Sequence, residues 1–313
     1  MIWDILFIVL GVYCVLRGAD WLTDGASALA RRMRMSEMMI GLTIVAAGTS
    51  APELFVSVVS ALKDTPDLAV GNVVGSNTMN SMLIVGTAAL VAPMIISRAT
   101  VRKDIPFAIA ASVLLLVLCM NDNLTRIDGL LLLAGFAAFM AYTIYSSRTA
   151  LSDPDAETAA SETSKPLWRD IAFVLFGLIG LVVGSNVFVS HASSLAYSLG
   201  ISEGVVGLTV VAGGTSLPEL ATSVVAARKG QSAIAIGNVI GSNVFNILLI
   251  LGLSATISPL HIEGITTIDM AVMLVSIVLV WLFSRTRYTV ERWEGAVLVV
   301  GYLAYLGWLI SAL

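Results

Sequence analysis

The sequence contains few charged residues. Asp, Glu, Lys and Arg together make up 12% of its 313 residues, whereas 58% are hydrophobic. A soluble domain carries about 25% charged residues, so this chain has too little charge to cover its surface in water. Its formal net charge of −4 also excludes a strongly basic protein, and we expect no nucleic-acid partner. The composition is typical of a protein that lies in a lipid bilayer.

Cysteine and histidine are also scarce, with two of each in the chain. Cys14 and Cys119 lie in apolar runs, where we expect small buried side chains rather than a disulfide or a zinc site. The apolar runs contain no pair of a nucleophile with a base and no cluster of His with Cys. We therefore expect neither enzyme activity nor a cofactor.

Long apolar runs dominate the sequence instead. A helix needs about 20 apolar residues to cross a bilayer. Ten such runs are present, and the loops between them are mostly short. The runs are 3–29, 37–62, 68–91, 104–120, 128–147, 168–198, 203–227, 233–257, 267–284 and 293–312. The expected fold class is an all-α polytopic membrane protein with ten transmembrane helices.

Basic residues are unevenly distributed over the loops. Alternate loops contain 14 Lys and Arg residues, and the other loops contain only Lys63 and Arg126. Because basic loops stay in the cytoplasm, we expect both termini outside and the segment 148–167 inside. Residues 151–166 are acidic and rich in Ser, Thr and Ala, which favours a solvated linker over a regulatory cation site. The expected partners are the lipid bilayer and inorganic cations, without an obligate protein partner.

Two segments of the chain repeat each other. Residues 41–86 and 207–252 align at an offset of 166 without a gap, with 27 identities in 46 positions. The chain therefore divides into a first half, 1–150, and a second half, 167–313, with five expected helices each. Since five is odd, the second half enters the membrane from the opposite side. Inverted five-helix repeats of this kind are typical of secondary transporters, whose ion sites lie between the repeats near the bilayer midplane.

The first repeated motif, GTSxPE, occupies 48–53 and 214–219, in the middle of an expected helix. Pro52 has no N–H and crowds the carbonyl of Gly48, so we expect the helix to break there. Non-helical backbone at this depth is tolerated only where protein or a wet cavity receives it. The carbonyls from Ala46 to Gly48 therefore become candidate cation ligands.

The side chains of this motif carry hard oxygen ligands. Thr49, Ser50 and Glu53 are three or four residues apart and share a helix face. Carboxylate, hydroxyl and carbonyl oxygens suit Na⁺ and Ca²⁺. An ionised Glu at the bilayer centre costs at least ~2.5 kcal/mol, and the repeat places a second one, Glu219, at the equivalent position. We expect the pair to bind a cation; the structural alternative is a protonated Glu that hydrogen-bonds a neighbouring helix.

The second repeated motif, GNxxGSNxxN, begins at Gly71 and again at Gly237. Asn72, Ser76 and Asn80 are spaced by four, so they form a polar line along one helix face, and the same line recurs 166 residues later. We expect both lines to border a hydrated path. The glycines beside them are expected to pack helices closely together.

The first apolar run also contains charged residues. Arg17 precedes Asp20 by three residues, and Asp24 follows one turn later. We expect an internal ion pair here rather than a part of the cation site.

Together the two motifs resemble the α-repeats of the cation/calcium exchanger superfamily, above all its prokaryotic sodium/calcium exchanger branch. The resemblance covers essentially the whole chain. It implies a secondary antiporter that exchanges Na⁺ for Ca²⁺ by alternating access in the cytoplasmic (inner) membrane. It also implies ion ligands in both halves, two of them alanines that act through their backbone carbonyls. The implied ligands are Ala46, Thr49, Ser50, Glu53, Ser76, Asn80, Ala212, Thr215, Ser216, Glu219, Ser242 and Asn246.

Two features of the resemblance concern the coupling ion. Some family members carry Asp where this chain has Asn246, and in K⁺-dependent exchangers an Asp in the second repeat matters for K⁺. Asn at both 80 and 246 therefore implies K⁺ independence. The acidic–His signature of proton/calcium exchangers is absent from these helices, and H⁺-coupled antiport of Ca²⁺ or another cation stays as the alternative.

Overall fold

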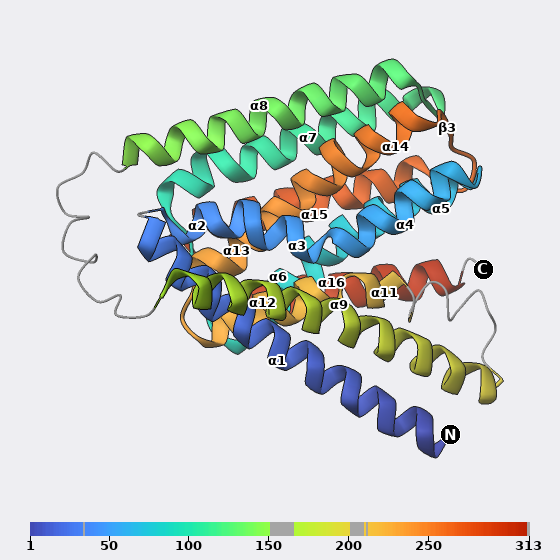
Figure 1. Cartoon of the computed structure of the whole chain (residues 1–313). Helices are drawn as coiled ribbons and strands as arrows, with labels where there is room; N and C mark the ends of the chain where they lie inside the picture. Colours follow the sequence, from blue (N-terminus) through green and yellow to red (C-terminus); the bar gives the residue numbers. More distant parts are fainter. Residues whose placement is uncertain (34, 151–165, 201–209, 211, 312–313) are drawn as a thin grey trace.

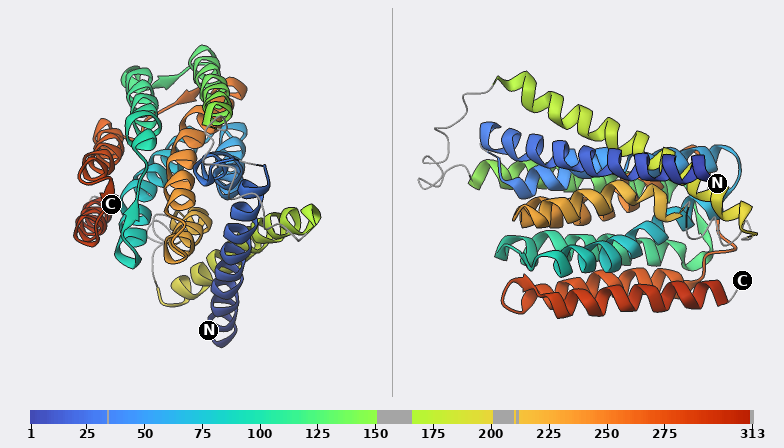
Figure 2. Two further views of the ribbon diagram at one scale, coloured as in Figure 1. Left: turned by 90° about the vertical axis from the view of Figure 1, so that its left-hand side faces the viewer. Right: turned by 90° about the horizontal axis from the view of Figure 1, so that it is seen from below.

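A computed structural model describes residues 1–33, 35–150, 166–200, 210 and 212–311 of the chain. These residues form a bundle of long helices (Figures 1 and 2). The elements of the first half are α1 (Ile2–Met33), α2 (Glu37–Ile40), η1 (Gly41–Val45), α3 (Ala46–Thr49), α4 (Ala51–Leu62), α5 (Pro66–Met79), η2 (Asn80–Ile84), α6 (Val85–Val91), β1 (Met94–Ile95), η3 (Thr100–Asp104), α7 (Ile105–Leu118), η4 (Cys119–Asn121), β2 (Asn123–Leu124) and α8 (Arg126–Ala150). Those of the second half are α9 (Leu167–Ser198), α11 (Ala212–Thr215), α12 (Leu217–Arg228), α13 (Ser232–Val244), η7 (Phe245–Leu251), α14 (Gly252–Ile257), β3 (Leu260–His261), α15 (Thr267–Arg285), β4 (Thr289–Val290) and α16 (Arg292–Ser311).

Seven of the described helices are long and apolar enough to cross a membrane. They are Ile2–Met33, Thr100–Asn121, Arg126–Tyr145, Leu167–Ser198, Ser232–Ile257, Thr267–Arg285 and Arg292–Ser311. An eighth candidate is the pair Glu37–Thr49 and Ala51–Leu62, whose axes differ by 49°. The expected span 68–91 is helical from Pro66 to Val91, but it is not among these candidates, and its Asn, Ser and Thr residues lower its hydropathy. The chain is thus an all-α multi-pass membrane protein.

Two parts of the sequence-based organisation lie outside the described residues. The acidic linker 151–166 is described only at Pro166, and the expected span 203–227 is described from residue 212 onward and at residue 210. The number of ten helices therefore stays a prediction.

The helices α1 and α9 cross at one side of the bundle (Figures 1 and 2). Glycines on both helices allow their backbones to touch. A Cβ atom at Gly18 would lie 2.7 Å from the backbone nitrogen of Leu181, and one at Gly177 would lie 2.6 Å from that of Leu22. No side chain fits into such a space, so the two equivalent helices pack directly against each other.

Short strand pairs also join the two halves. β1 pairs antiparallel with β4, and β2 pairs antiparallel with β3. At the repeat offset of 166, β3 is the equivalent of β1 and β4 is the equivalent of β2. Each half therefore contributes one strand to each pair, and the two pairs are counterparts of each other.

Candidate ion-binding site

Both GTSxPE motifs lie where a helix breaks. Ser50 has φ −80° and ψ 8° between α3 and α4, and Ser216 has φ −88° and ψ 8° between α11 and α12. The proline of each motif then falls in the first positions of the new helix, where a missing N–H costs little. Glu53 and Glu219 lie in the first turns of α4 and α12. The helix dipole favours a carboxylate at that position.

The backbone carbonyls at these breaks are less free than the sequence predicts. The Ala46 carbonyl accepts the N–H of Ser50 over 3.0 Å and lies 3.4 Å from Thr49 Oγ1. In the second half, the Gly214 carbonyl accepts the hydroxyl of Ser185 on α9. The expectation of freed carbonyls is thus met only in part. A carbonyl oxygen has two lone pairs. Thr49 has one hydroxyl hydrogen, and its shorter contact is to Asn238 Oδ1 at 2.9 Å, so the second lone pair of Ala46 can bind a cation.

Each carboxylate is held by a serine of the other half. Ser50 donates to Glu219 Oε1 over 3.0 Å, and Ser216 donates to Glu53 Oε1 over 2.9 Å. Both Glu side chains have an exposed fraction of 0%. Their second oxygens, Oε2, have no hydrogen-bond partner among the described residues. Buried acceptors in native structures are nearly always paired, so these two oxygens are candidate ligands for a cation.

Four asparagines form a second reciprocal set between the halves. Asn80 donates to Asn243 Oδ1 over 3.1 Å, and Asn246 donates to Asn77 Oδ1 over 3.0 Å. The Oδ1 atoms of Asn80 and Asn246 are buried and have no partner in the described part of the chain. Because the amide nitrogens are engaged, these oxygens remain available as neutral ligands.

Asn72 and Asn238 attach each acid-bearing helix to its neighbour. Asn72 donates to the Glu53 carbonyl over 3.2 Å and to Ser57 Oγ over 2.9 Å. Asn238 makes the equivalent contacts in the second half, at 3.4 and 3.0 Å. Thr49 also donates to Asn238 Oδ1 over 2.9 Å. The first asparagine of the second motif therefore fixes the helix that carries the acid in each half.

Predicted ligands from both halves lie in contact with one another in the described part of the structure. Ser216 lies 3.0 Å from Ser76 Oγ in addition to its contact with Glu53. Ser242 Oγ is buried without a hydrogen-bond partner among the described residues. Ala212 and Thr215 are the first and last residues of α11, the helix that leads into the second break.

Sequence reasoning assigned no role to four residues of this network, although two of them stand in the second motif. Their contacts show that they position the ligands rather than supply free oxygens. They are Ser57, Asn77, Ser223 and Asn243.

Two carboxylates and several neutral oxygens define the chemistry of the site. In the described parts of the chain, no three His, Cys, Asp or Glu side chains lie together, so the site has the charge of Glu53 and Glu219 alone. Oxygen ligands select hard cations such as Ca²⁺ and Na⁺ over soft metals. Two negative charges match one Ca²⁺ or two Na⁺.

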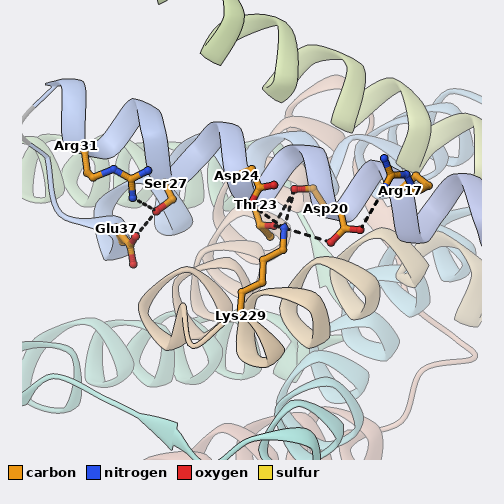
Figure 3. Close-up of polar contacts among 8 residues, drawn as sticks. All are labelled: Arg17, Asp20, Thr23, Asp24, Ser27, Arg31, Glu37 and Lys229. Atoms are coloured by element: carbon orange, nitrogen blue, oxygen red, sulfur yellow. Dashed lines mark hydrogen bonds and ion pairs between the residues drawn. The ribbon is translucent and has the colours of Figure 1, made fainter. Parts of the chain in front are cut away.

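A separate group of charges joins α1 to α12 (Figure 3). Lys229 Nζ lies 2.8 Å from Asp24 Oδ1 and 3.2 Å from Asp20 Oδ1. The expected pair of Arg17 with Asp20 is present at 3.7 Å, but Lys229 of the second half is the nearer partner. These acids hold α1 in place and contribute no ligand to the site between Glu53 and Glu219.

The fold and the site define an all-helical, multi-pass membrane protein with buried carboxylates and amides between its two halves. A family model described as sodium/calcium exchanger protein matches residues 3–145 and 170–311. The chain belongs to this family, as the paired motifs predicted.

Full-length relatives agree with this assignment. The chain is 35% identical over 340 residues to the sodium/calcium exchanger MaX1 of Methanosarcina acetivorans, with 97% of each chain covered. It is 37% identical to the inner membrane protein YrbG of Escherichia coli, with 96% of this chain and 95% of YrbG covered. Its structure matches that of the sodium-calcium exchanger NCX_Mj with a TM-score of 0.86 and 30% identity, over 98% of this chain and 99% of the other.

Proposed function

We propose that this protein is a secondary antiporter that exchanges Na⁺ for Ca²⁺, with Glu53 and Glu219 as its central ligands. One observation supports the proposal most strongly: both carboxylates are fully buried, and each has one oxygen without a hydrogen-bond partner among the described residues. An ionised carboxylate inside a bilayer costs at least ~2.5 kcal/mol, and a bound cation offsets that cost. The names of MaX1 and NCX_Mj as sodium/calcium exchangers support the same conclusion.

Competition for shared oxygens would couple the two ions. Ca²⁺ takes six to eight oxygen ligands, and the twelve predicted ligand residues provide enough for either cation. The ion-free site places two negative charges side by side in a medium of low dielectric, and this form should resist the change between the two access states. The protein would then exchange ions rather than leak them.

Ten spans in two inverted halves, 1–150 and 167–313, complete the proposed architecture. The reciprocal hydrogen bonds and the exchanged strand pairs support it, as does the match of the family model in two separate segments. The excess of basic residues in alternate loops supports termini outside and the segment 148–167 in the cytoplasm. Alternating access would open the buried site to one side at a time.

We also propose that transport is independent of K⁺. The free amide oxygens of Asn80 and Asn246 are neutral, so the site has no third carboxylate to balance an additional cation. Equal Ca²⁺ transport in K⁺-containing and K⁺-free buffers would support this, and a requirement for K⁺ would contradict it.

The test is Ca²⁺ uptake into proteoliposomes that are loaded with Na⁺ and diluted into Na⁺-free buffer. We expect uptake in the unmodified protein and a fall to background in Glu53→Gln and in Glu219→Gln, because each variant removes one of two charges that bind Ca²⁺. Glu263→Gln is the matched control, since Glu263 is 78% exposed and lies outside the site. Uptake that depends on a pH gradient and not on Na⁺ would identify H⁺ as the coupling ion. Unchanged uptake in both Gln variants would contradict the assignment of Glu53 and Glu219 as ligands.

A further inference from the structure

A basic and aromatic pocket lies where α7 begins and α15 ends. It is a cavity of about 360 Å³ that contains none of the candidate ion ligands. Its walls are Val101, Arg102, Pro106, Trp281, Arg285 and Tyr288. Arg102 and Arg285 are exposed, whereas Trp281 and Tyr288 are half-buried, so the pocket opens to the surface of the protein.

Contacts between elements fix the aromatic walls. Trp281 Nε1 donates to the Val101 carbonyl over 2.9 Å and thereby joins α15 to η3. The Tyr288 carbonyl accepts the N–H of Ile96 over 2.8 Å, next to the β1–β4 pair. The pocket is therefore formed by three segments that the fold holds together.

Two of the arginines at this pocket, Arg285 and Arg98, lie over aromatic rings. The guanidinium carbon of Arg285 lies 4.8 Å from the centre of the Trp281 ring, and that of Arg98 lies 5.2 Å from the centre of the Tyr288 ring. Within the described residues, neither of them nor Arg102 forms an ion pair with a carboxylate. A guanidinium stacked on a ring keeps its N–H edge free, and that planar fork matches the oxygens of a phosphate group.

Apolar stripes continue from the pocket along both helices. On α7, Val113 and Val117 follow Pro106 at helical spacing and are exposed. On α15, Leu282 and Val275 precede the end of the helix and are also exposed. In a bilayer these faces meet acyl chains, while Trp and Tyr side chains favour the depth of the headgroups.

The repeat shows that the fold alone does not create this pocket. We compared four residues of the pocket, two arginines, one tryptophan and one tyrosine, with the residues at the repeat offset of 166. None of these equivalents is basic or aromatic. These equivalents are Ile268, Cys119, Leu115 and Asp122. The charge and the rings therefore belong to one end of the α7–α15 pair only.

We propose that this pocket binds the headgroup of an anionic phospholipid. The phosphate lies between Arg102 and Arg285, the glycerol part contacts Trp281 and Tyr288, and the chains follow the exposed stripes of α7 and α15. Basic pockets between membrane helices are suited to such headgroups. A lipid fits better than free phosphate because the apolar stripes lead directly from the two arginines. The pocket shares no residue with the candidate ion ligands. A negative result for lipid binding would therefore not affect the proposed Na⁺/Ca²⁺ exchange.

The test measures binding of phosphatidylglycerol to the purified full-length protein by native mass spectrometry and by the shift of its thermal unfolding. We expect phosphatidylglycerol to bind and to raise the unfolding temperature, and phosphatidylcholine and inorganic phosphate to do neither. Arg102→Gln and Arg285→Gln should each weaken binding about fivefold, and the double variant about 30-fold. Lys103→Gln, which removes the same charge one residue away from the pocket wall, should bind as the unmodified protein does.

Three results would overturn the proposal. One is equal retention of phosphatidylcholine and phosphatidylglycerol by the unmodified protein, a comparison that needs no variant to fold. Another is an equal shift with inorganic phosphate, which would assign the pocket to a free anion. The third is an equal loss of binding in Lys103→Gln and in the arginine variants, which would indicate general surface charge.

Discussion

The helices α5 and α13 carry the same motif but lie in different surroundings. Gly241 of α13 is buried, and a Cβ atom there would lie 2.7 Å from the carbonyl oxygen of Leu42. Its equivalent on α5, Gly75, is exposed, and a Cβ atom there would meet no described residue within 4 Å. Asn238 is fully buried on α13, whereas Asn72 on α5 is half-buried. Among the described residues, the candidate site is therefore covered more completely on the α13 side than on the α5 side.

This difference shows that two halves with the same chemistry need not occupy the same environment. Close helix packing by glycine, which the sequence predicts for both halves, is confirmed at Gly241. At Gly75 it stays a prediction, because residue 208, the counterpart of Leu42, lies outside the described residues. In the proposed alternating-access mechanism, the two environments would change places when the site opens to the other membrane face. Equivalent substitutions on α5 and α13 test this difference in the membrane.

Labelling of an introduced thiol should give the largest contrast. The two native cysteines are free, so Cys14 is replaced by serine and the buried Cys119 is kept as an internal control. We expect Gly75→Cys to react with a membrane-impermeant maleimide in proteoliposomes and Cys119 to stay unreactive, because Gly75 is exposed and no described residue lies within 4 Å of its Cβ position. Labelling is followed by mass spectrometry.

The outcome separates water from lipid at this face. If Gly75→Cys reacts only with membrane-permeant reagents, the exposed side of α5 faces acyl chains and does not lead to the ion site. A rate that falls when Ca²⁺ is added would strengthen the comparison, since it would link this face to the occupancy of the site.

The second contrast concerns stability. Gly241→Ala should destabilise the protein by about 1–3 kcal/mol, because the new methyl group meets the backbone of Leu42 and something must shift. Gly75→Ala should stay within about 0.5 kcal/mol of the unmodified protein, as the new methyl group meets no described residue within 4 Å. Thermal unfolding in detergent measures both variants. Equal unfolding temperatures for the two would contradict the proposed asymmetry of packing.

The two supporting asparagines should differ less. Asn238→Ala removes a buried amide that contacts the Glu219 carbonyl and accepts from Thr49, and it should cost about 1–3 kcal/mol. Asn72→Ala removes the equivalent amide at a position that is only half-buried, so a cost of about 1 kcal/mol is expected. Unfolding curves together with Ca²⁺ uptake check this pair. A larger cost for Asn72→Ala would reverse the assignment of the open side.

The sequence predicted the centre of the site because two local signals coincide there. Pro52 and Pro218 mark the helix breaks, and the adjacent Glu53 and Glu219 are costly enough in a bilayer to need a ligand. Two occurrences of each motif made the pattern specific.

The remaining features depend on contacts between the halves. Ser50 and Glu219 are 169 positions apart, and no periodicity reports such a pairing. The supporting roles of Asn77 and Asn243 arise only when α5 and α13 face each other. The difference between Gly75 and Gly241 could not be predicted at all, since both stand in the same motif and the sequence therefore predicts the same packing for both.

The smallest contrast lies at the ends of α4 and α12, at the equivalent residues Lys63 and Lys229. Lys229 contacts two acids of α1 (Figure 3), but the corresponding positions on α9 are Asn186 and Ser190. Within the described residues, Lys63 is exposed and forms no ion pair. Lys229→Ala should therefore cost about 0.2–1 kcal/mol and Lys63→Ala less than that, because partly exposed ion pairs stabilise little. The loss in Lys229→Ala should shrink when choline chloride, which contains neither transported ion, screens the pair. A cost that does not change with salt would mean that Lys229 stabilises the protein through packing and not through its ion pairs.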